Sequence, residues 1–486
     1  MTATTPSSYD VLVLGGGTAG MTVAKLVARG GRSVALIEAE RTGGDCLFTG
    51  CVPSKSLIAT ARLMHAIRGA AAHGIDIGAL ALDLRRTMAR KDAIIERVGE
   101  ADSAEQLERE GVEVIQGRAR CVSPHGVVVD GRSIYGAQIV IATGSRPAIP
   151  PLPGLESTDY LTNVELMHLA ELPARLGVIG AGATGLELGQ AFARFGSAVT
   201  VIDHGERVLD EADAEVSNLL RHTLEAEGIR FDLSTAVERV ERAGTTTRLT
   251  LRSPNGMLFP LEVDALLIAT GRAPNTENLD LDAVDVATTK RGVRVDARLR
   301  TSVPHIWACG DVIGPPYFTH AAEDQARTVA NNILGDRGTW SDRVLPWVVF
   351  TDPEIAAVGL TEAAAREAYG DRVEVLRLPY ERIDRAVTDG TADGRIKVIL
   401  APGWTRGLAG GEIVGAHVTG AHAGELIGQL GFAIRWHLPA GLLAKAVQAY
   451  PTYALGVRQA VGMHWYRAAA QGSGSPLARL LKRLGD

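Results

Sequence analysis

The residues best suited to chemistry lie in one short stretch, GGDCLFTGCVPSK, which runs from Gly43 to Lys55. Cys46 and Cys51 are five positions apart, and Lys55 follows Cys51 by four. Two cysteines can form a disulfide when the backbone brings their Cα atoms within roughly 4.4–6.8 Å of each other. Closing so small a loop adds little stability, because that contribution grows with loop length. The pair is therefore better explained by redox chemistry than by structural support.

The residues after Cys51 predict a helix with apolar positions on one face, among them Leu57, Ile58 and Ala61. A thiol at the start of a helix, with a lysine nearby, forms its thiolate more readily than a free cysteine does. The alternatives are two buried free thiols or half of a zinc site. No second cysteine pair or histidine cluster lies near enough in sequence to complete a zinc site. We therefore expect a redox-active disulfide and no metal site.

Composition limits the class of protein. Hydrophobic residues make up 46% of the chain and charged residues 22%, as in a soluble globular protein. The net charge of −6 gives no indication of nucleic-acid binding. No apolar run reaches the roughly 18 residues of a membrane span, and the N-terminus does not resemble a signal peptide. Four cysteines are too few for a secreted disulfide framework, so we expect a cytoplasmic protein.

The stretch before the cysteines has the pattern of a nucleotide site. The apolar residues 9–14 predict a buried strand that runs directly into Gly15-x-Gly17-x-x-Gly20. A helical stretch and a second strand follow, and the second strand ends at Glu38. Glycines at this spacing permit a tight turn and bring a pyrophosphate to the helix N-terminus, while the acid can bind a ribose. The complete βαβ pattern predicts a dinucleotide site.

The same pattern occurs a second time. A strand leads into Gly180-x-Gly182-x-x-Gly185, a helix follows, and the next strand ends at Asp203. A carboxylate at that position binds a ribose 2′-hydroxyl and repels a 2′-phosphate, which favours NADH over NADPH. Two neighbouring side chains could weaken this preference, namely His204 and Arg207. Two such motifs in one chain predict two bound dinucleotides.

The C-x4-C-x-P-x-K signature after the first nucleotide motif resembles that of the flavoprotein disulfide reductases, which include lipoamide dehydrogenase, glutathione reductase and mercuric reductase. The resemblance covers nearly the whole chain. It implies that the first motif holds FAD and the second holds NAD(P)H. It also implies that electrons pass from NAD(P)H through FAD to the Cys46–Cys51 disulfide, and from there to an acceptor.

The resemblance also implies roles for individual residues. Cys51 would remain beside the flavin as a charge-transfer thiolate, while the more exposed Cys46 attacks or ligates the substrate. Glu187 would pair with Lys55 near the flavin, although an acid in the first turn of a helix is also favoured by the helix dipole. Gly271 is expected in the NAD(P) site. The remaining expected FAD contacts are Gly44, Ala142, Thr143, Gly144, Gly310, Asp311 and Ala321. The other two cysteines, Cys121 and Cys309, are expected to be core thiols.

The C-terminal region departs from the thiol–disulfide members of this family. They carry a His-Pro-Thr stretch with a glutamate five residues after the histidine, and this pair acts as a general acid and base. Here Tyr450 stands at the histidine position and Leu455 at the glutamate position. Tyrosine, whose ordinary pKa is about 10, is a poor base at neutral pH. Mercuric reductases also carry a tyrosine here, but this C-terminal tail lacks their vicinal cysteine pair.

We expect an α/β fold with two Rossmann-like nucleotide-binding domains and a C-terminal α+β dimerisation domain. The expected FAD domain comprises residues 1–150 and 276–344, and residues 151–275 form the NAD(P) domain. Residues 345–470 form the interface domain of a homodimer, in which Tyr450 of one subunit faces the thiols of the other. Residues 471–486 form a basic amphipathic tail, which we expect to dock on its own subunit rather than on a membrane or another protein.

For the acceptor, a metal ion or a small disulfide is favoured, as in a mercuric reductase-like enzyme. One alternative is a dihydrolipoamide dehydrogenase-like enzyme that uses another base. A second is a quinone or dye reductase, in which the flavin passes electrons on without the thiols. A third is a redox sensor or electron-transfer partner that docks on another protein.

Overall fold

The computed structural model describes residues 7–402 and 411–470. The chain folds into two compact units. The first unit contains the residues up to Gly180, together with Ala191–Ile202 and Ala236–Asp342. The second contains Ala181–Gln190, Asp203–Thr235 and the residues from Arg343 onwards.

A central sheet organises the first unit, with the strand order β3-β2-β1-β6-β5-β4 and β18 also paired with β6. β1 is parallel to β2 and β6, as a βαβ unit requires. Both faces of β1 are buried, so its sequence is a continuous apolar run rather than an alternation of apolar and polar residues. The bounds of the strands are β1 (Ser7–Leu14), β2 (Val34–Glu38), β3 (Val112–Gln116), β4 (Ala119–Ser123), β5 (Gly126–Val129), β6 (Arg132–Ile141) and β18 (Ile306–Ala308).

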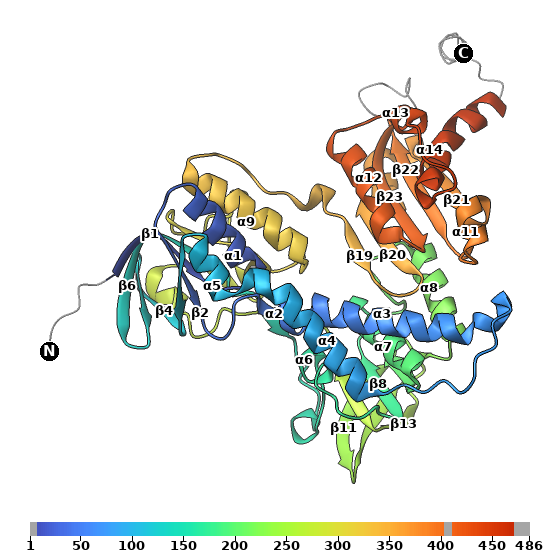
Figure 1. The fold of residues 1–486 in the computed structure, drawn as a ribbon, viewed down its shortest axis with the longest axis horizontal. Helices are drawn as coiled ribbons and strands as arrows, with labels where there is room; N and C mark the ends of the chain where they lie inside the picture. The colour runs from blue at the N-terminus through green and yellow to red at the C-terminus, as the bar shows by residue number, and fades with distance from the viewer. Residues whose placement is uncertain (1–6, 403–410, 471–486) are drawn as a thin grey trace. The chain divides into compact units, whose positions relative to one another are not determined.

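Two helices cover one face of this sheet. α1 (Thr18–Arg29) and α9 (Thr319–Leu334) lie side by side (Figure 1). They pack with the β1 side chains Val11 and Val13, which point to that face. Consequently the N-termini of two helices far apart in sequence are anchored to a single sheet.

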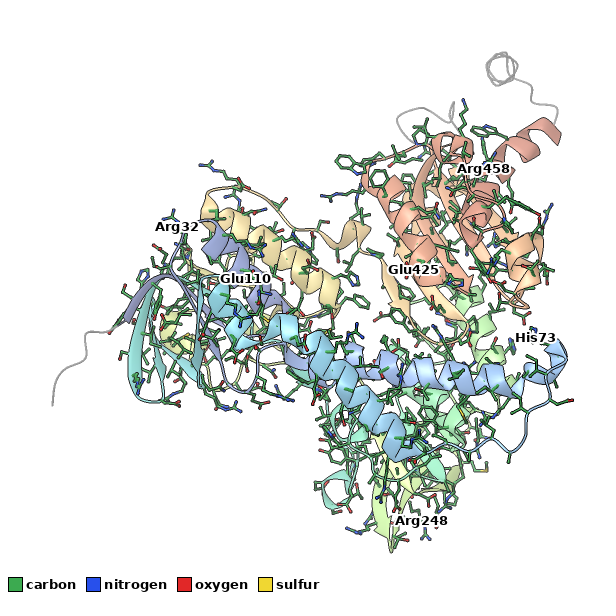
Figure 2. All side chains as sticks on the ribbon, in the orientation of Figure 1. Arg32, His73, Glu110, Arg248, Glu425 and Arg458 are labelled. Carbon is green, nitrogen blue, oxygen red and sulfur yellow. The ribbon has the colours of Figure 1, made fainter. Side chains whose placement is uncertain are left out.

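The second nucleotide motif also forms the predicted strand–helix–strand unit. β8 (Arg175–Ile179) is parallel to β9 (Ala198–Ile202) and to β14 (Ala265–Ile268), and α7 (Ala183–Phe195) connects β8 and β9. An antiparallel sheet follows, made of β11 (Ala236–Ala243), β12 (Thr246–Arg252) and β13 (Leu258–Val263). Figure 2 shows Arg248 on this sheet, where it forms a cross-strand ion pair with Glu262.

The cysteines lie at the junction of two helices, α2 (Gly44–Phe48) and α3 (Cys51–Arg68), so the helix predicted after Cys51 is confirmed. The charged, amphipathic sequence at about residues 75–115 also predicts helical structure, and this prediction is only partly correct. Residues 74–83 are irregular, because Gly74 adopts a left-handed conformation that ends the preceding helical turn. Helical structure resumes with α4 (Leu84–Gly99), which Asp83 caps by accepting from the Arg86 N–H, and continues with α5 (Ala104–Arg109).

The core of the second unit is an antiparallel sheet in the order β19-β20-β23-β22-β21. Its strands are β19 (Trp347–Val349), β20 (Glu354–Gly359), β21 (Glu374–Pro379), β22 (Arg395–Ala401) and β23 (Glu412–Gly420). The helices of this unit include α8 (Ala214–Ala226), α10 (Glu362–Tyr369), α11 (Asp384–Thr388), α12 (Ala423–Arg435), α13 (Ala440–Lys445) and α14 (Tyr453–Ala470). The remaining short strands and helices are α6 (Asn163–Leu166), β7 (Ser145–Pro147), β10 (Arg230–Asp232), β15 (Arg272–Pro274), β16 (Thr288–Thr289) and β17 (Gly292–Val293).

Within the described residues, no helix combines the length and the apolar character needed to cross a membrane. The tail at 471–486, interpreted from sequence as amphipathic, lies outside the described residues.

Candidate active site

The two cysteines converge on one hydroxyl group. Thr319, the first residue of α9, donates a hydrogen bond from Oγ1 to the Sγ of Cys46 at 3.2 Å. The same oxygen lies 3.4 Å from the Sγ of Cys51. In this structure the two cysteines are in the dithiol form, which is the reduced state of the expected redox-active pair. The α2–α3 junction and the start of α9 therefore hold a dithiol that a single threonine bridges.

The surroundings of the two thiols differ. A hydrogen bond with Cys51 and burial both raise the pKa of Cys46, while the hydrogen bond from Thr319 opposes that rise. The expectation that Cys46 is the more exposed thiol is wrong, because Cys46 is half-buried and Cys51 is exposed. The α2–α3 turn is tight, since a Cβ placed on Gly50 would lie 3.2 Å from the Cα of Cys46.

At glycines of the first motif, a side chain would clash with the neighbouring backbone. Gly15 has φ +107°, and a Cβ there would clash with the carbonyl of Ala142. A Cβ on Gly20 would clash with the carbonyl of Gly15. Gly44 has φ +64°, and its Cβ would lie 2.8 Å from the Cα of Gly17. The starts of α1 and α2 thus meet without intervening side chains, and this arrangement fits a pyrophosphate bound at the N-terminus of α1.

Glu38 closes the same turn. One of its carboxylate oxygens accepts from the N–H of Gly16 at 2.6 Å, and the other accepts from the N–H of Glu40 at 2.7 Å. Each carboxylate oxygen has a second lone pair, so the group retains the capacity to accept from a ribose hydroxyl. The position fits the ribose role that the motif predicts.

The predicted Ala142–Gly144 turn is held by reciprocal hydrogen bonds with Asn275. Thr143 Oγ1 donates to the Asn275 carbonyl at 2.7 Å, and the Asn275 side chain donates to the Thr143 carbonyl at 2.9 Å. The N–H of Asn275 donates to the carbonyl of Gly144 at 2.9 Å. Ala142 itself continues the β1 pairing by donating to Leu14. The turn is consequently fixed at the end of the sheet, beside the first glycine motif.

Gly310 and Asp311 form a second turn at the end of the sheet. The side chain of Gln325, buried in α9, accepts from the N–H of Gly310 at 2.7 Å. Gly310 has φ +77°, and a Cβ there would come within 3.0 Å of the Cβ of Ala19 in α1. Ala321, also in α9, is fully buried. Asp311 therefore lies where α1 and α9 both begin.

A polar network joins this turn to the residue before Cys46. Ser145 donates to Asp311 at 2.5 Å, and Arg272 donates to the Ser145 hydroxyl at 2.6 Å. Arg272 also pairs with the carboxylate of Asp45 at 2.8 Å, and Thr49 donates to that same carboxylate. Burial raises the pKa of Asp311, and Ser145 and Arg272 oppose the rise. The network thus ties the thiol helices to a turn that is expected to contact FAD.

The second nucleotide motif has the same backbone features as the first. Gly180 has φ +114°, and a Cβ there would clash with the carbonyl of Ala269. Asp203 accepts from the N–H of Ala181 at 2.6 Å and from the N–H of Gly205 at 2.7 Å. These contacts reproduce those of Glu38 in the first motif. Open space surrounds the Cα positions of Gly182 and Gly271, and Gly185 lies in the first turn of α7. The site fits a second dinucleotide.

Three further residues were assigned roles from the sequence. Lys55 lies one turn into α3, after Cys51. Glu187 is buried in α7 and accepts from the N–H of Phe350 at 2.8 Å, and its pairing with Lys55 remains a prediction. Tyr450 is 71% exposed and donates to the carboxylate of Asp384 at 3.0 Å. The hydrogen bond to Asp384 raises the pKa of Tyr450, which keeps the phenol protonated.

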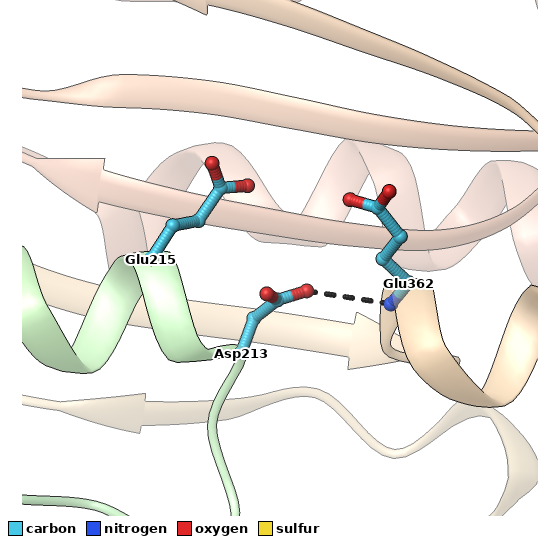
Figure 3. A group of neighbouring side chains, drawn as sticks. All are labelled: Asp213, Glu215 and Glu362. Carbon is cyan, nitrogen blue, oxygen red and sulfur yellow. Dashed lines mark hydrogen bonds between the residues drawn. The ribbon is translucent and has the colours of Figure 1, made fainter. Parts of the chain in front are cut away.

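One group of carboxylates has the spacing of a metal site, comprising Asp213, Glu215 and Glu362 (Figure 3). The ammonium group of Lys397 lies among them, at 2.8, 2.5 and 2.8 Å respectively. Lys397 is only 2% exposed, so its charge takes the place that a cation would otherwise occupy. This cluster is a buried ion-pair network and carries no metal assignment.

Sequence reasoning missed three residues that contact the predicted site. Thr319 bridges the thiols, Asp45 links them to Arg272, and Asp384 binds Tyr450. Asp45 could have been predicted from the sequence, because an acid directly before a reactive thiol is expected to pair with a positively charged side chain. The other two contacts had no local signal, since their partners are remote in sequence.

Several large apolar side chains of the second unit are exposed. Phe432 and Trp436 pack against each other on α12, with exposed fractions of 61% and 64%. Val447 is 94% exposed. Clustered exposed apolar residues of this kind mark an interaction surface.

Comparison with known proteins identifies family models and individual proteins that are similar to this chain. The model of the pyridine nucleotide-disulphide oxidoreductase family matches residues 9–326, and the dimerisation-domain model of the same family matches residues 345–461. A mercuric reductase of Staphylococcus aureus is 33% identical, over 93% of this chain and 82% of its own. A dihydrolipoyl dehydrogenase of Thermus scotoductus is 36% identical, over 93% of this chain and 96% of its own.

Solved structures of one protein are also similar, namely the HOCl-induced flavoprotein disulfide reductase RclA from Escherichia coli. One RclA structure has a TM-score of 0.83 and 30% identity, and covers 94% of this chain and 100% of its own. A second is described as the Cu(II) complex of RclA, with a TM-score of 0.83, 29% identity, and coverage of 94% and 99%.

Proposed function

Because the chain belongs to the pyridine nucleotide-disulphide oxidoreductase family, we propose that it reduces thiol-reactive metal ions at Cys46 and Cys51. Members of this family are FAD-dependent and use NAD(P)H, and their dimerisation domain forms homodimers. FAD would supply electron transfer from the nicotinamide to the sulfur pair. Residues of the first glycine motif and Asp311 would hold it, and the second motif would bind NAD(P)H.

The observation that carries this proposal is the group at position 450. Disulfide reduction places protons on both product thiols, so it depends on a group that delivers and removes protons. Tyr450 stands where the thiol–disulfide members carry histidine, and its bond to Asp384 keeps it protonated at neutral pH. Reduction of a metal ion requires no proton on the product. A site without a base near neutrality suits that reaction better.

The thiols are suitable ligands for such an ion. Thiolate sulfur prefers soft metals such as Cu(I), and closely spaced cysteines can bind one together. Thr319 contacts both sulfurs and compensates charge on whichever one is deprotonated. The names of the S. aureus mercuric reductase and of the Cu(II) complex of RclA agree with this acceptor class. We further propose that Tyr450 of the partner subunit faces the metal-bound thiols.

Proton balance distinguishes the candidate reactions. One NADH reduces two Cu(II) ions to Cu(I) and yields NAD⁺ and one released proton. Reduction of a disulfide or a quinone by one NADH instead consumes one proton. The direction of the pH change during turnover therefore distinguishes the reduction of a metal ion from the reduction of a disulfide or a quinone.

The test uses the FAD-loaded protein in weak buffer with a pH indicator, with NADH as donor and Cu(II) as acceptor. A chelator that forms a coloured Cu(I) complex reports the product. We expect one proton released for each NADH oxidised, and loss of Cu(II) reduction in Cys46→Ser. Cys121→Ala is the matched control, because Cys121 is a buried core thiol outside the site. Proton uptake with lipoamide, at a higher rate than Cu(II) reduction, would contradict the proposal.

The second candidate is a dihydrolipoamide dehydrogenase-like reaction, which the 36% identity to the T. scotoductus enzyme favours. It requires a base other than Tyr450. Retention of NADH–quinone activity in Cys46→Ser, with no metal or lipoamide activity in the wild type, would instead support a quinone reductase.

A further inference from the structure

One face of the sheet in the second unit carries polar side chains. Lys397 on β22 pairs in register with Arg377 on β21 and with His417 on β23, so the three residues share that face. Arg395 and Thr419 form the next cross-strand pair on the same face. The residues between them point to the opposite face, where the apolar core of the unit lies. Polar groups this far inside a domain need hydrogen-bond partners.

A pocket of about 200 Å³ lies between α8 and this polar face. Its polar lining consists of Glu215 and His222 from α8, and of Arg395, Lys397, His417 and Thr419 from the sheet. All of these residues belong to the second unit. His417 and Thr419 are buried, whereas His222 and Arg395 are exposed. The pocket therefore has a polar base inside the unit and a mouth that opens to solvent.

The imidazole of His417 has hydrogen-bonding capacity that the protein does not use. His417 is 3% exposed, and neither ring nitrogen has a hydrogen-bond partner among the described residues. Burial lowers the pKa of His417, so the ring is neutral at neutral pH and carries one N–H. Asp213 and the carbonyl of Leu360 oppose this shift, the carbonyl without hydrogen-bond geometry. A buried polar group of this kind gains free energy from a ligand that bonds to it.

The carboxylate in the pocket is already saturated. The two oxygens of Glu215 contact Lys397 at 2.5 Å and Arg395 at 3.1 Å, respectively. The Nε of Arg377 lies 3.3 and 3.1 Å from the same two oxygens. A carboxylate offers about four lone-pair positions, so little acceptor capacity remains for a further donor. The pocket consequently does not suit a cationic ligand.

The ion-pair network around Lys397 has an excess of positive charge. Its carboxylates are Asp213, Glu215 and Glu362 (Figure 3), and the cations paired with them are Lys397, Arg366, Arg377 and Arg395. Three negative and four positive charges leave one positive charge over. The hydrogen-bonding groups of the pocket that remain available are mainly donors, because a guanidinium has five N–H groups and Arg395 bonds Glu215 through one terminal nitrogen.

We propose that this pocket binds a small oxyanion of the phosphate class, held by Arg395 at the mouth and by the Thr419 hydroxyl and the His417 N–H at the base. Guanidinium and hydroxyl donors suit phosphate oxygens, and charge-assisted hydrogen bonds to them are strong. The volume suits inorganic phosphate or a small phosphomonoester, whereas pockets for larger ligands start at about 300 Å³. None of these residues belongs to either glycine motif, and the inference does not depend on the proposed acceptor.

The test uses the FAD-loaded protein in phosphate-free buffer, with NAD⁺ in excess so that the second glycine motif is occupied. Calorimetric titration with inorganic phosphate should show one bound anion for each chain. Arg395→Gln should weaken binding at least about tenfold, because it removes a hydrogen bond between charged groups. Thr419→Val keeps the shape of the side chain, and loss of its hydroxyl should also weaken binding about tenfold.

Arg366→Gln is the matched control. It removes the same charge from the same network, with a side chain that is 50% exposed compared with 45% for Arg395, but it does not line the pocket. Binding should weaken less than about threefold, because salt screens interactions with exposed charges. Phosphate should raise the Tm of the wild type and of this control, and raise that of Arg395→Gln much less. A parallel titration with glycerol phosphate tests the phosphomonoester, and binding of either compound supports the inference.

No binding of either compound at millimolar concentration would overturn the inference. Equal weakening in Arg395→Gln and Arg366→Gln would do so too, because it would indicate diffuse attraction rather than a site. Affinity that is unchanged in Thr419→Val would exclude the base of this pocket, and circular dichroism confirms that each variant is folded. Failure to reduce any metal ion would refute the proposed acceptor class and leave these binding results interpretable.

Discussion

Thr319 Oγ1 donates a hydrogen bond to the Sγ of Cys46 at 3.2 Å, although 273 positions separate the two residues. The same hydroxyl lies 3.4 Å from the Sγ of Cys51, so one donor serves both sulfurs. Because Thr319 is the first residue of α9, the packing of α9 beside α1 fixes its position. The chemistry of the thiol pair thus depends on a helix that belongs to a distant part of the chain.

Replacing Thr319 by valine removes this donor while keeping the shape of the side chain. Thr319 Oγ1 contacts both sulfurs, and its hydrogen bond lowers the pKa of Cys46, so loss of this donor should raise the pH at which the reduced pair deprotonates. A hydrogen bond to a charged group contributes about 1.5–3 kcal/mol, which corresponds to about 1–2 pH units. The measurement is a pH titration of the long-wavelength band given by NADH reduction. Thr319→Ser should behave like the wild type, and an unchanged titration in Thr319→Val would contradict the role.

Restoring the histidine–glutamate pair should shift the acceptor preference. In Tyr450→His combined with Leu455→Glu, an imidazole near its ordinary pKa of about 6.5 can move protons at neutral pH. We expect dihydrolipoamide activity to rise by about 10²–10⁴-fold, the usual contribution of a general acid–base. Steady-state assays with lipoamide and Cu(II) provide the measurement, with Tyr450→Phe as a variant that should gain no lipoamide activity. No gain in the double variant would argue that position 450 does not limit disulfide chemistry.

A charge in the exposed apolar surface of α12 should weaken the homodimer. Trp436 is 64% exposed in the single chain and packs against Phe432, so burial of the pair in an interface favours association. Trp436→Glu should shift the protein toward monomer at micromolar concentration, as measured by light scattering. Leu63→Glu is a comparable control on α3, where Leu63 is 59% exposed. Dimers of equal stability in both variants would exclude the α12 surface from the interface.

Lys397 should be essential for the stability of the second unit. It contacts three carboxylates while only 2% exposed, so Lys397→Met leaves their charges without their shared partner. Loss of one member of a buried ionic group costs about 3–5 kcal/mol. Denaturant unfolding monitored by circular dichroism measures the loss. Arg366→Met removes only an exposed partner of Glu362 and should cost under about 1 kcal/mol. Equal effects of the two variants would show that burial of Lys397 is energetically unimportant.

The same cluster predicts a specific dependence of stability on acid. Burial alone would raise the pKa of Glu362, but the hydrogen bonds from Lys397 and Arg366 lower it to about 2. A depressed pKa in the folded state stabilises the protein above the unfolded-state pKa of about 4.5. That contribution is lost as the pH falls from about 4.5 toward 2. The free energy of unfolding of the wild type should therefore decline across this window, and Glu362→Gln should decline less steeply. Parallel curves for the two proteins would refute this account.

Much of the fold follows from local patterns. The β1–α1–β2 and β8–α7–β9 units occur where apolar runs and glycine spacing predicted them, because the strands, the glycine turn and the helix of each unit lie in one continuous stretch of chain. Even the contacts of the two acids repeat, since Glu38 and Asp203 each accept from the backbone of their own glycine turn. The irregular segment at 74–83 was not predicted, because its charged and apolar residues do not reveal the left-handed glycine that ends the helical turn before it.

The sequence by itself determined the class of chemistry: the cysteine pair, two nucleotide motifs, and the substitution of Tyr450 and Leu455 for a proton-transfer pair. Only the tertiary structure decided which groups surround these residues. Thr319 reaches both thiols, Arg272 joins Asp45 to the Asp311 turn, and Asp384 holds Tyr450. Spacing within a motif is read along the chain, whereas a hydrogen bond or ion pair requires two side chains to meet in space. That meeting is set by the packing of helices on a sheet, which no local pattern encodes.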